Sequence, residues 1–255
     1  MAYGLTQSMR LTQSSSEYAT AADSTSLSIT GDITIECWIK IKSQVSSGTG
    51  WFLVMKSTAG GSNRSYELTY EYFGANPILQ MRIFGAGTPT NFWTGFLTYT
   101  LTVDTWTHIA VSVDVSAAAA SKAEWVIDGV SQGAGTGTDT GTGATSIHDN
   151  ATALRIGQSD PVNAGFYPDA QFSLVRIWDV LRTATQLNDN KCNVFGTTTT
   201  NMVAEWSLDN VYTDASGNGN TLSGVNTPTF VSDVPSTCSA GGGAVLPQFK
   251  GFACL

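Results

Sequence analysis

Apolar and polar side chains alternate with a period of two along most of the chain, the pattern of strands that are buried on one face. In residues 33–41 every odd position is apolar and most even positions are polar. The same alternation is found at residues 66–72, 79–83, 97–103 and 109–113. Further segments that fit strands occupy residues 51–55, 124–128, 154–157, 171–178 and 202–208. Ten or more strands with short connections predict an all-β fold, a two-sheet antiparallel β-sandwich.

The local signals between these strands predict turns and one short helix. Thr183 and Gln186 have the spacing of a capping box, so we expect a helix near residues 183–191. Asp128-Gly129 follows an apolar run and indicates a hairpin turn. The Gly/Thr-rich tract at residues 133–145 indicates a loop or an edge ribbon.

The length of 255 residues fits one β-sandwich. We expect the sandwich to cover residues 1–235, and residues 236–255 to form a Gly-rich linker followed by an apolar tail. The first residues lack a basic region followed by an apolar one, so a secretory signal either was removed or is not used, and the second is favoured. No apolar run reaches the roughly 18 residues that would cross a bilayer.

Charge and cysteine content narrow the functions further. The net charge is −8 and only 13% of residues are charged, so phosphate backbones would repel the chain and a nucleic acid partner is excluded. The cysteines have no C-x-x-C pair, which argues against zinc. Cys37 lies in a predicted strand and is expected to be a small buried apolar group. One disulfide among Cys192, Cys238 and Cys254 is compatible with the sequence, and its pairing is open.

The order of these segments resembles the laminin G-like and pentraxin-related branch of the concanavalin A-like superfamily. The matching stretches are residues 27–40, Trp106-Thr107-His108-Ile109-Ala110-Val111, Trp125-Val126-Ile127-Asp128-Gly129, and residues 154–157, 172–179 and 202–220. The resemblance implies two curved sheets in jelly-roll order, with glycans or proteins bound on the concave face or at one rim, often with calcium. Two departures argue against a pentraxin-style double calcium site: Ala110 stands where pentraxins usually have a disulfide cysteine, and the acidic ligand run is thinned to Gln158-Ser159-Asp160.

Some segments match catalytic motifs in sequence, but the elements expected around them are not those that the chemistry needs. Residues 129–133 fit G-x-S-x-G, but a Gly/Thr tract follows where the nucleophile elbow needs a helix. Glu67 and Glu71 share a strand face about 13 Å apart, too far for a retaining glycosidase pair, so we expect a solvated strand face. His108 is expected at a packing position and His148 in a loop, and neither has a nucleophile partner that the sequence can place.

One loop has the composition of a cation site. Oxygen side chains alternate there, with glycine at the sixth position as in the opening of an EF-hand loop: Asp214, Ser216, Asn218 and Asn220. The twelfth position is Val225 rather than a bidentate Glu. A Gly/Asn turn with left-handed backbone angles is the favoured alternative to a structural Ca²⁺ site. Asp160 and Asp169 are weaker ligand candidates.

Aromatic side chains that stack on sugar rings are the expected binding device in a lectin-like groove. Tyr66, Tyr70 and Tyr72 share one strand face, which is expected to be directed mainly toward the core. Phe92-Trp93 lies in a Gly/Pro-bounded segment that is interpreted as a loop, so Trp93 is expected to be exposed. The candidate ligand-binding residues are Trp93, Phe92, Tyr70 and Tyr72.

These observations predict a non-catalytic, surface-exposed module on a virion or a cell surface, such as a decoration, fibre or adhesin component. Its expected partners are glycans or neighbouring subunits of an oligomeric assembly, which the apolar tail would contact. A secreted calcium-dependent lectin-like domain is the first alternative. A glycoside hydrolase is the last.

Overall fold

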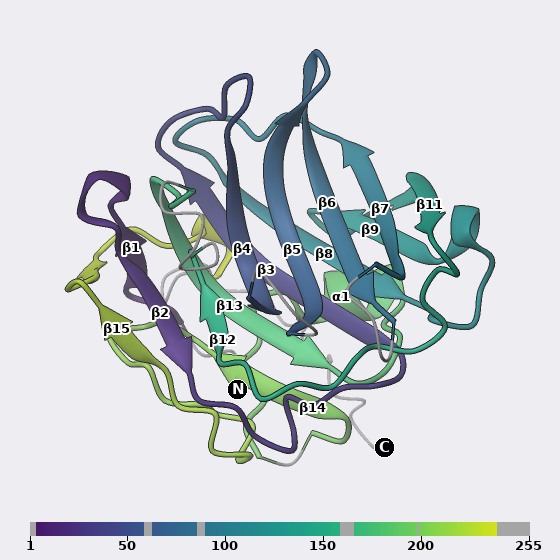
Figure 1. Cartoon of the computed structure of the whole chain (residues 1–255). Helices are drawn as coiled ribbons and strands as arrows, with labels where there is room; N and C mark the ends of the chain where they lie inside the picture. The colour runs from purple at the N-terminus through teal and green to yellow at the C-terminus, as the bar shows by residue number, and fades with distance from the viewer. Residues whose placement is uncertain (1–3, 59–62, 86–89, 159–165, 198, 239–255) are drawn as a thin grey trace, which may run out of the picture.

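The computed structural model describes residues 4–58, 63–85, 90–158, 166–197 and 199–238. They form two antiparallel sheets packed face to face, with one α-helix, as predicted and consistent with a jelly roll (Figure 1). The first sheet has the order β10-β9-β8-β3-β13-β1-β16, and β14 also pairs with β13. The second has the order β11-β7-β6-β5-β4-β12-β2-β15.

Most of the longer strands coincide with the predicted segments of alternating polarity. The first sheet contains β1 (Ser8–Leu11), β3 (Ile33–Ile41), β8 (Trp106–Val113), β9 (Ala123–Ile127), β10 (Val130–Gly133), β13 (Ala170–Trp178), β14 (Met202–Trp206) and β16 (Thr229–Val231). The second sheet contains β2 (Tyr18–Ala21), β4 (Gly50–Ser57), β5 (Arg64–Phe73), β6 (Asn76–Phe84), β7 (Phe92–Thr98), β11 (Thr136–Thr140), β12 (Leu154–Ile156) and β15 (Ser223–Val225). Three 3-10 turns are η1 (Gln13–Ser15), η2 (Ala119–Ser121) and η3 (Ser236–Cys238).

The core lies between the two sheets and is built by the apolar positions of the alternation. In β3 the odd residues from Ile33 to Ile41, Cys37 among them, are all buried. Burial raises the pKa of the Cys37 thiol, which fits the predicted role as an inert apolar group. Burying one face of each sheet in this way provides the hydrophobic driving force of the fold.

The helix α1 (Ala184–Asn190) begins at the predicted capping box. The Thr183 hydroxyl accepts a hydrogen bond from the Gln186 backbone N–H, and the Gln186 side chain accepts one from Thr183. Leu187 then packs on Ala110 and Val126, which point away from the core on the first sheet. The helix therefore covers part of the outer face of that sheet (Figure 1). Among the described residues, no helix is long and apolar enough to cross a membrane.

The strand predicted at residues 97–103 is wrong in its position. The strand is β7, Phe92–Thr98, and the chain beyond it turns through Asp104, which has a φ of 58°. Phe92 and Trp93 therefore lie in a strand rather than a loop, and Trp93 is 0% exposed. Its Nε1–H donates to the Ala119 carbonyl at 2.8 Å. Gly95 makes room for the indole, because a Cβ there would lie 2.2 Å from the ring.

Two other predicted connections are confirmed. Asp128-Gly129 forms the turn of the β9–β10 hairpin, and Ser131 lies in a strand rather than at the start of a helix, so no nucleophile elbow forms. The Gly/Thr tract contributes β11, an edge strand that pairs with β7.

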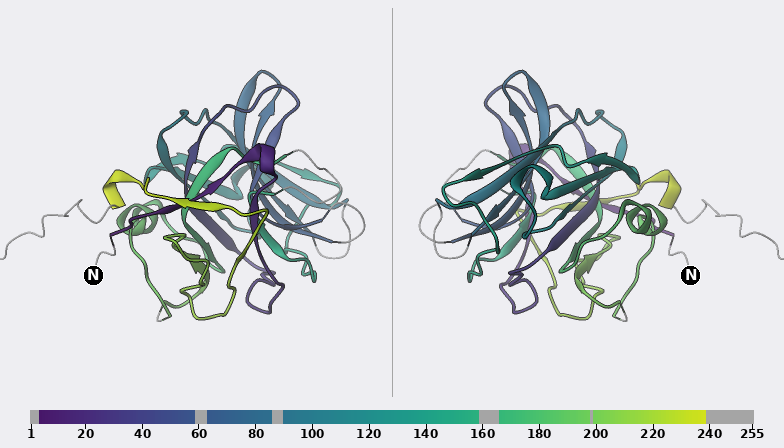
Figure 2. Two further views of the ribbon diagram at one scale, coloured as in Figure 1. Left: turned by 90° about the vertical axis from the view of Figure 1, so that its left-hand side faces the viewer. Right: turned by 90° about the vertical axis from the view of Figure 1, so that its right-hand side faces the viewer.

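The last described residues are joined to the sandwich by a disulfide between Cys192 and Cys238. The Leu5 backbone N–H donates to the Cys238 carbonyl at 3.0 Å. Figure 2 accordingly shows η3 and the N-terminal segment on the same side of the molecule. Of the predicted linker and tail at residues 236–255, the first three residues form η3, and residues 239–255, with Cys254, lie outside the described residues.

Candidate functional site

A cavity of about 300 Å³ lies where β4 begins and β5 ends. Phe52 pairs opposite Thr69, and Gly50 pairs opposite Glu71. These residues alternate with Trp51 and Tyr70, which are buried in the core, so they face away from it on the outer side of the second sheet. We call this cavity the β4–β5 cavity. Its lining residues are Gly48, Thr49, Gly50, Trp51, Phe52, Thr69, Glu71, Tyr72 and Phe166.

The β4–β5 cavity combines aromatic rings with one fixed carboxylate. Phe52 and Phe166 are both half-buried, and they come from segments more than 100 residues apart in the sequence. The Thr69 hydroxyl donates to Glu71 Oε1 at 3.1 Å, and Arg82 Nη2 donates to the same oxygen at 3.4 Å. Rings that offer a flat apolar surface beside an oriented acceptor are the usual elements of a sugar site.

The polar side chains of β5 beside this cavity do not form the solvated strand face that the sequence predicts. Glu67 and Thr69 are buried and Glu71 is half-buried, which corrects that prediction. Glu67 is buried and lies 3.4 Å from Arg82, which also reaches Glu71. Burial raises the pKa of Glu67 although Arg82 and Arg64 oppose that effect. Arg82 therefore bridges the two carboxylates, whereas in a retaining glycosidase the two carboxylates flank the scissile bond.

The predicted ligand-binding residues are divided between the cavity and the core. Tyr72 lines the β4–β5 cavity, and its hydroxyl donates to the Ala75 carbonyl. Tyr70 is buried, with its hydroxyl hydrogen-bonded to Gln44 and to the Leu101 backbone. Phe92 packs against Phe84, with ring centroids 5.5 Å apart. The expected exposure of Trp93 is wrong, because a ring that lies between the sheets presents no face to solvent.

The oxygen-rich loop at residues 214–220 is a hydrogen-bonded turn, the favoured alternative of the sequence analysis. Asp214 Oδ1 accepts the backbone N–H groups of Glu205 and Ser216, and Oδ2 accepts from the Ser216 hydroxyl and the Asn220 backbone. The side-chain amide of Asn218 donates to the Met202 and Val203 carbonyls. With the carboxylate bonded to four donors and this amide directed at carbonyls, the loop does not fit a calcium ion.

The two weaker candidates for calcium ligands are Asp169 and Asp160. Asp169 forms an ion pair with Arg10, and Asp160 lies outside the described residues. Among the residues that the structure describes, no group of three or more His, Cys, Asp or Glu side chains is arranged to hold a metal ion.

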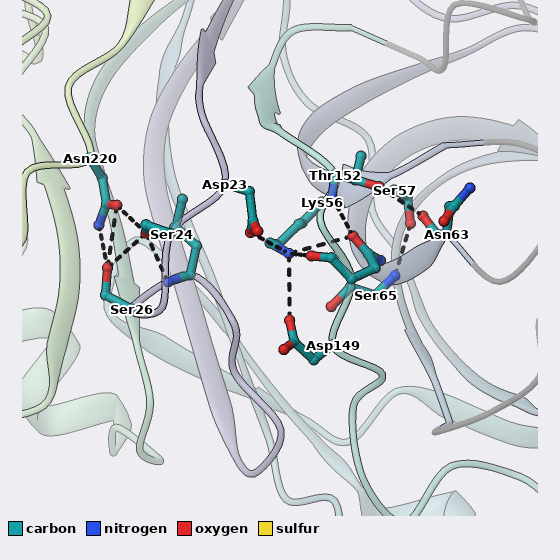
Figure 3. A network of polar contacts seen from close by, with 12 residues as sticks. Asp23, Ser24, Ser26, Lys56, Ser57, Asn63, Ser65, Asp149, Thr152 and Asn220 are labelled. Atoms are coloured by element: carbon teal, nitrogen blue, oxygen red, sulfur yellow. Dashed lines mark hydrogen bonds and ion pairs between the residues drawn. The ribbon is translucent and has the colours of Figure 1, made fainter.

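A set of oxygens that would suit a hard cation surrounds Lys56 instead (Figure 3). Lys56 Nζ lies 3.0 Å from Asp23 Oδ1, 3.9 Å from Asp149 Oδ1 and 3.4 Å from Asn150 Oδ1, and it also donates to the Asn150 carbonyl. These oxygens belong to two loops, which the ammonium joins to β4. The positive charge at this point is therefore supplied by the chain itself.

The Laminin_G_3 family model, described as concanavalin A-like lectin/glucanases superfamily, matches residues 13–188. A Bacteroides ovatus protein whose carbohydrate binding has been proposed superimposes with a TM-score of 0.65 at 18% identity, over 90% of this chain and 60% of that one. The chain thus spans 60% of the length of that structure. A search of curated proteins finds no match.

Two further solved structures are more distant. A heptameric SAP-like pentraxin from Limulus polyphemus has a TM-score of 0.46 at 12% identity, over 71% of this chain and 79% of that one. Domain 4 of an extracellular GH43 arabinanase from Geobacillus stearothermophilus, in complex with arabinotriose, has a TM-score of 0.40 at 20% identity, over 64% and 68%. At these identities the likeness concerns the fold.

Proposed function

Because this chain belongs to the concanavalin A-like lectin/glucanases superfamily, we propose that it is a non-catalytic carbohydrate-binding domain that acts on an exposed surface. The observation that carries the proposal is the β4–β5 cavity. There Phe52 and Phe166 line the same cavity as a carboxylate, Glu71, that Thr69 and Arg82 hold in place.

The chemistry of the cavity suits a sugar better than an apolar ligand. The C–H face of a sugar ring packs on an aromatic ring, and its hydroxyls donate to a carboxylate. Arg82 and Thr69 hold Glu71 before any ligand arrives, so little side-chain entropy is lost on binding. The bridging position of Arg82 also argues against a glycosidase, because Glu71 is already committed to an ion pair.

The disulfide supports an extracellular or surface location. Disulfides persist in oxidising compartments, and the Cys192–Cys238 bond joins segments 46 residues apart. We propose that the domain is exposed outside the cytosol, where glycans are its ligands.

The test is a glycan array followed by calorimetry on the soluble oligosaccharides that bind. Phe52→Ala and Glu71→Gln should each weaken binding about tenfold or more, because each removes a central contact of a small site. Val130→Ala is the matched control, since Val130 is an exposed side chain on β10 of the other sheet. An array without any binder would overturn the proposal. Chromatographic detection of cleaved glycan would show that the domain is catalytic.

Membership of a virion or cell-surface assembly is a second, finer proposal. Two features of the sequence support it: the low share of charged residues, and the apolar tail at residues 244–255, which lies outside the described residues. Light scattering of the full chain and of a chain truncated after residue 240 tests it. The full chain should form oligomers and the truncated chain should not, and equal masses would contradict a role of the tail in assembly.

A further inference from the structure

Trp106 differs from every other tryptophan of the chain. The other six of the seven are buried, whereas Trp106 is half-buried and reaches solvent. It lies on β8 opposite Lys40 of β3, on the face of the first sheet that points away from the core. Trp38 lies on the same face, opposite His108. An indole ring left at the surface of a chain that buries all the others is a candidate contact for a ligand.

The two indoles line a cavity of about 230 Å³, which we call the Trp106 cavity. Its lining residues are Trp38, Trp106, Asp128, Lys191, Pro235, Ser236 and Thr237. The Trp38 Nε1–H donates to the Lys191 carbonyl at 2.7 Å, and the Trp106 Nε1–H donates to Asp233 Oδ1 at 3.0 Å. Both indole N–H groups are therefore engaged, which fixes the rings, and the half-buried Trp106 ring offers surface for a ligand.

A covalent bond holds the walls of the Trp106 cavity together. Lys191 on one side precedes Cys192, and Thr237 on the other precedes Cys238, and these two cysteines form the disulfide. The Leu5 N–H to Cys238 hydrogen bond adds a third segment at the same point. The shape of the cavity is thus set before a ligand binds, which lowers the entropic cost of binding.

The rim of the cavity defines the ligand chemistry. Asp128 is exposed and offers a carboxylate, and Lys191 Nζ bonds the Asp128 carbonyl at 3.0 Å and Asn188 Oδ1 at 2.9 Å. Because the Asp128 carboxylate and the Lys191 ammonium both lie at the rim, the cavity favours neither an anionic nor a cationic ligand. A neutral ligand with several hydroxyls therefore fits best. The volume is below the usual range for drug-sized ligands, which limits the occupant to about one ring.

We propose that the Trp106 cavity is a second carbohydrate site, on the sheet opposite the β4–β5 cavity, and that it binds one neutral sugar residue stacked on Trp106. The Asp128 carboxylate accepts hydroxyl hydrogen bonds at the rim. The site is independent of the proposed function of the β4–β5 cavity, because the two cavities share no lining residue.

The test uses the full chain and a panel of neutral sugars: glucose, galactose, mannose, xylose, arabinose and N-acetylglucosamine. Ligand-observed NMR should detect binding of at least one of them. The same sugar should protect Trp106 from iodide quenching of its fluorescence, since each of the other tryptophans is at most 4% exposed. Trp106→Leu should weaken the NMR-detected binding about tenfold or more, and Val130→Ala, at an exposed position that lines neither cavity, should leave it unchanged.

Two further variants keep the test independent of folding defects. Asp128→Asn keeps the Oδ1 that accepts the His108 backbone N–H and tolerates the positive φ of 52°, so it should fold and bind several-fold more weakly. Cys192→Ala/Cys238→Ala should weaken this site while the β4–β5 cavity keeps its affinity. The proposal is overturned if no sugar of the panel binds, if iodide quenching is unaffected, or if folded Trp106→Leu and Asp128→Asn bind like the parent.

Discussion

The ammonium of Lys56 and the carboxylate of Asp23 form a 3.0 Å ion pair in which the lysine side chain is 0% exposed and the aspartate is 31% exposed. The lysine cannot be solvated where it lies, while the aspartate is in contact with water. The pair thus attaches the segment after β2 to β4 at a point where an unpaired ammonium would be costly.

Replacing Lys56 by Met should lower the free energy of unfolding by about 1–3 kcal/mol, because it removes a buried donor that several oxygens share. Urea denaturation at neutral pH measures the change. Asp149→Asn is the matched control. Asp149 is 3.9 Å away and 54% exposed, so its loss should cost less than about 1 kcal/mol. Equal effects of the two substitutions would contradict the importance of burial.

Calcium should not stabilise this protein, because Lys56 supplies the cation of one oxygen cluster and hydrogen bonds saturate Asp214 in the other. Thermal unfolding with excess CaCl2 and with EDTA should give the same Tm. A Tm that rises with calcium concentration would show a site that these contacts do not reveal.

Glu36 makes the free energy of unfolding depend on pH in the acidic range. Burial by itself raises its pKa, but the charge of Arg176, a hydrogen bond and charge from His108 and a hydrogen bond from Trp178 lower it to about 2 from 4.5. A depressed carboxyl pKa stabilises the fold above the unfolded value, and this contribution is lost as the pH falls from 4.5 toward 2. Urea denaturation along this pH series should therefore show a falling free energy of unfolding.

Glu36→Gln should cost about 3–5 kcal/mol at neutral pH, because it leaves Arg176 buried without its counter-charge. The gap between variant and parent should narrow between pH 4.5 and pH 2, where the parent loses its own contribution. A gap that stays constant across that interval would be inconsistent with an ionised Glu36.

Removing the disulfide with Cys192→Ala/Cys238→Ala should lower the free energy of unfolding by about 2–4 kcal/mol, because the bond closes a loop of 46 residues in the unfolded chain. A reducing agent should destabilise the parent by a similar amount and leave the double variant unchanged. If reduction had no effect on the parent, the bond would not restrict the unfolded state.

Gly95→Ala should destabilise the sandwich by about 1–3 kcal/mol, since its Cβ would lie 2.2 Å from the Trp93 ring in a packed core. Gly31→Ala is the control, because nothing lies within 4 Å of a Cβ at that position. Thermal unfolding of the two variants should separate them clearly. Similar Tm values would mean that the Trp93 ring can move aside.

The period-two pattern and the Thr183–Gln186 spacing were sufficient to predict the sheets and the helix, because both are local signals. Periodicity failed at residues 99–103, where an extended connection alternates in the same way as a strand. The position of Trp93 depends on where β7 begins, and the sequence feature that indicates it is Gly95, on the same face of that strand, where the missing side chain leaves room for the ring.

The cavities could not be predicted from local patterns, since each one combines distant segments. Phe52 and Phe166 line one cavity, and Trp106, Lys191 and Thr237 line the other, only in the folded arrangement of the two sheets. The disulfide pairing was open for the same reason, because sequence spacing does not determine which cysteines meet.

The hydrogen bond between Leu5 and Cys238 brings the first and last described parts of the sandwich to one corner. A flanking module attached at either end would therefore depart from the same place, and the sandwich could be inserted into a larger polypeptide without stretching its host. Such a graft would leave the β4–β5 cavity free on the opposite sheet, whereas the flanking polypeptide would depart beside the Trp106 cavity and could restrict access to it.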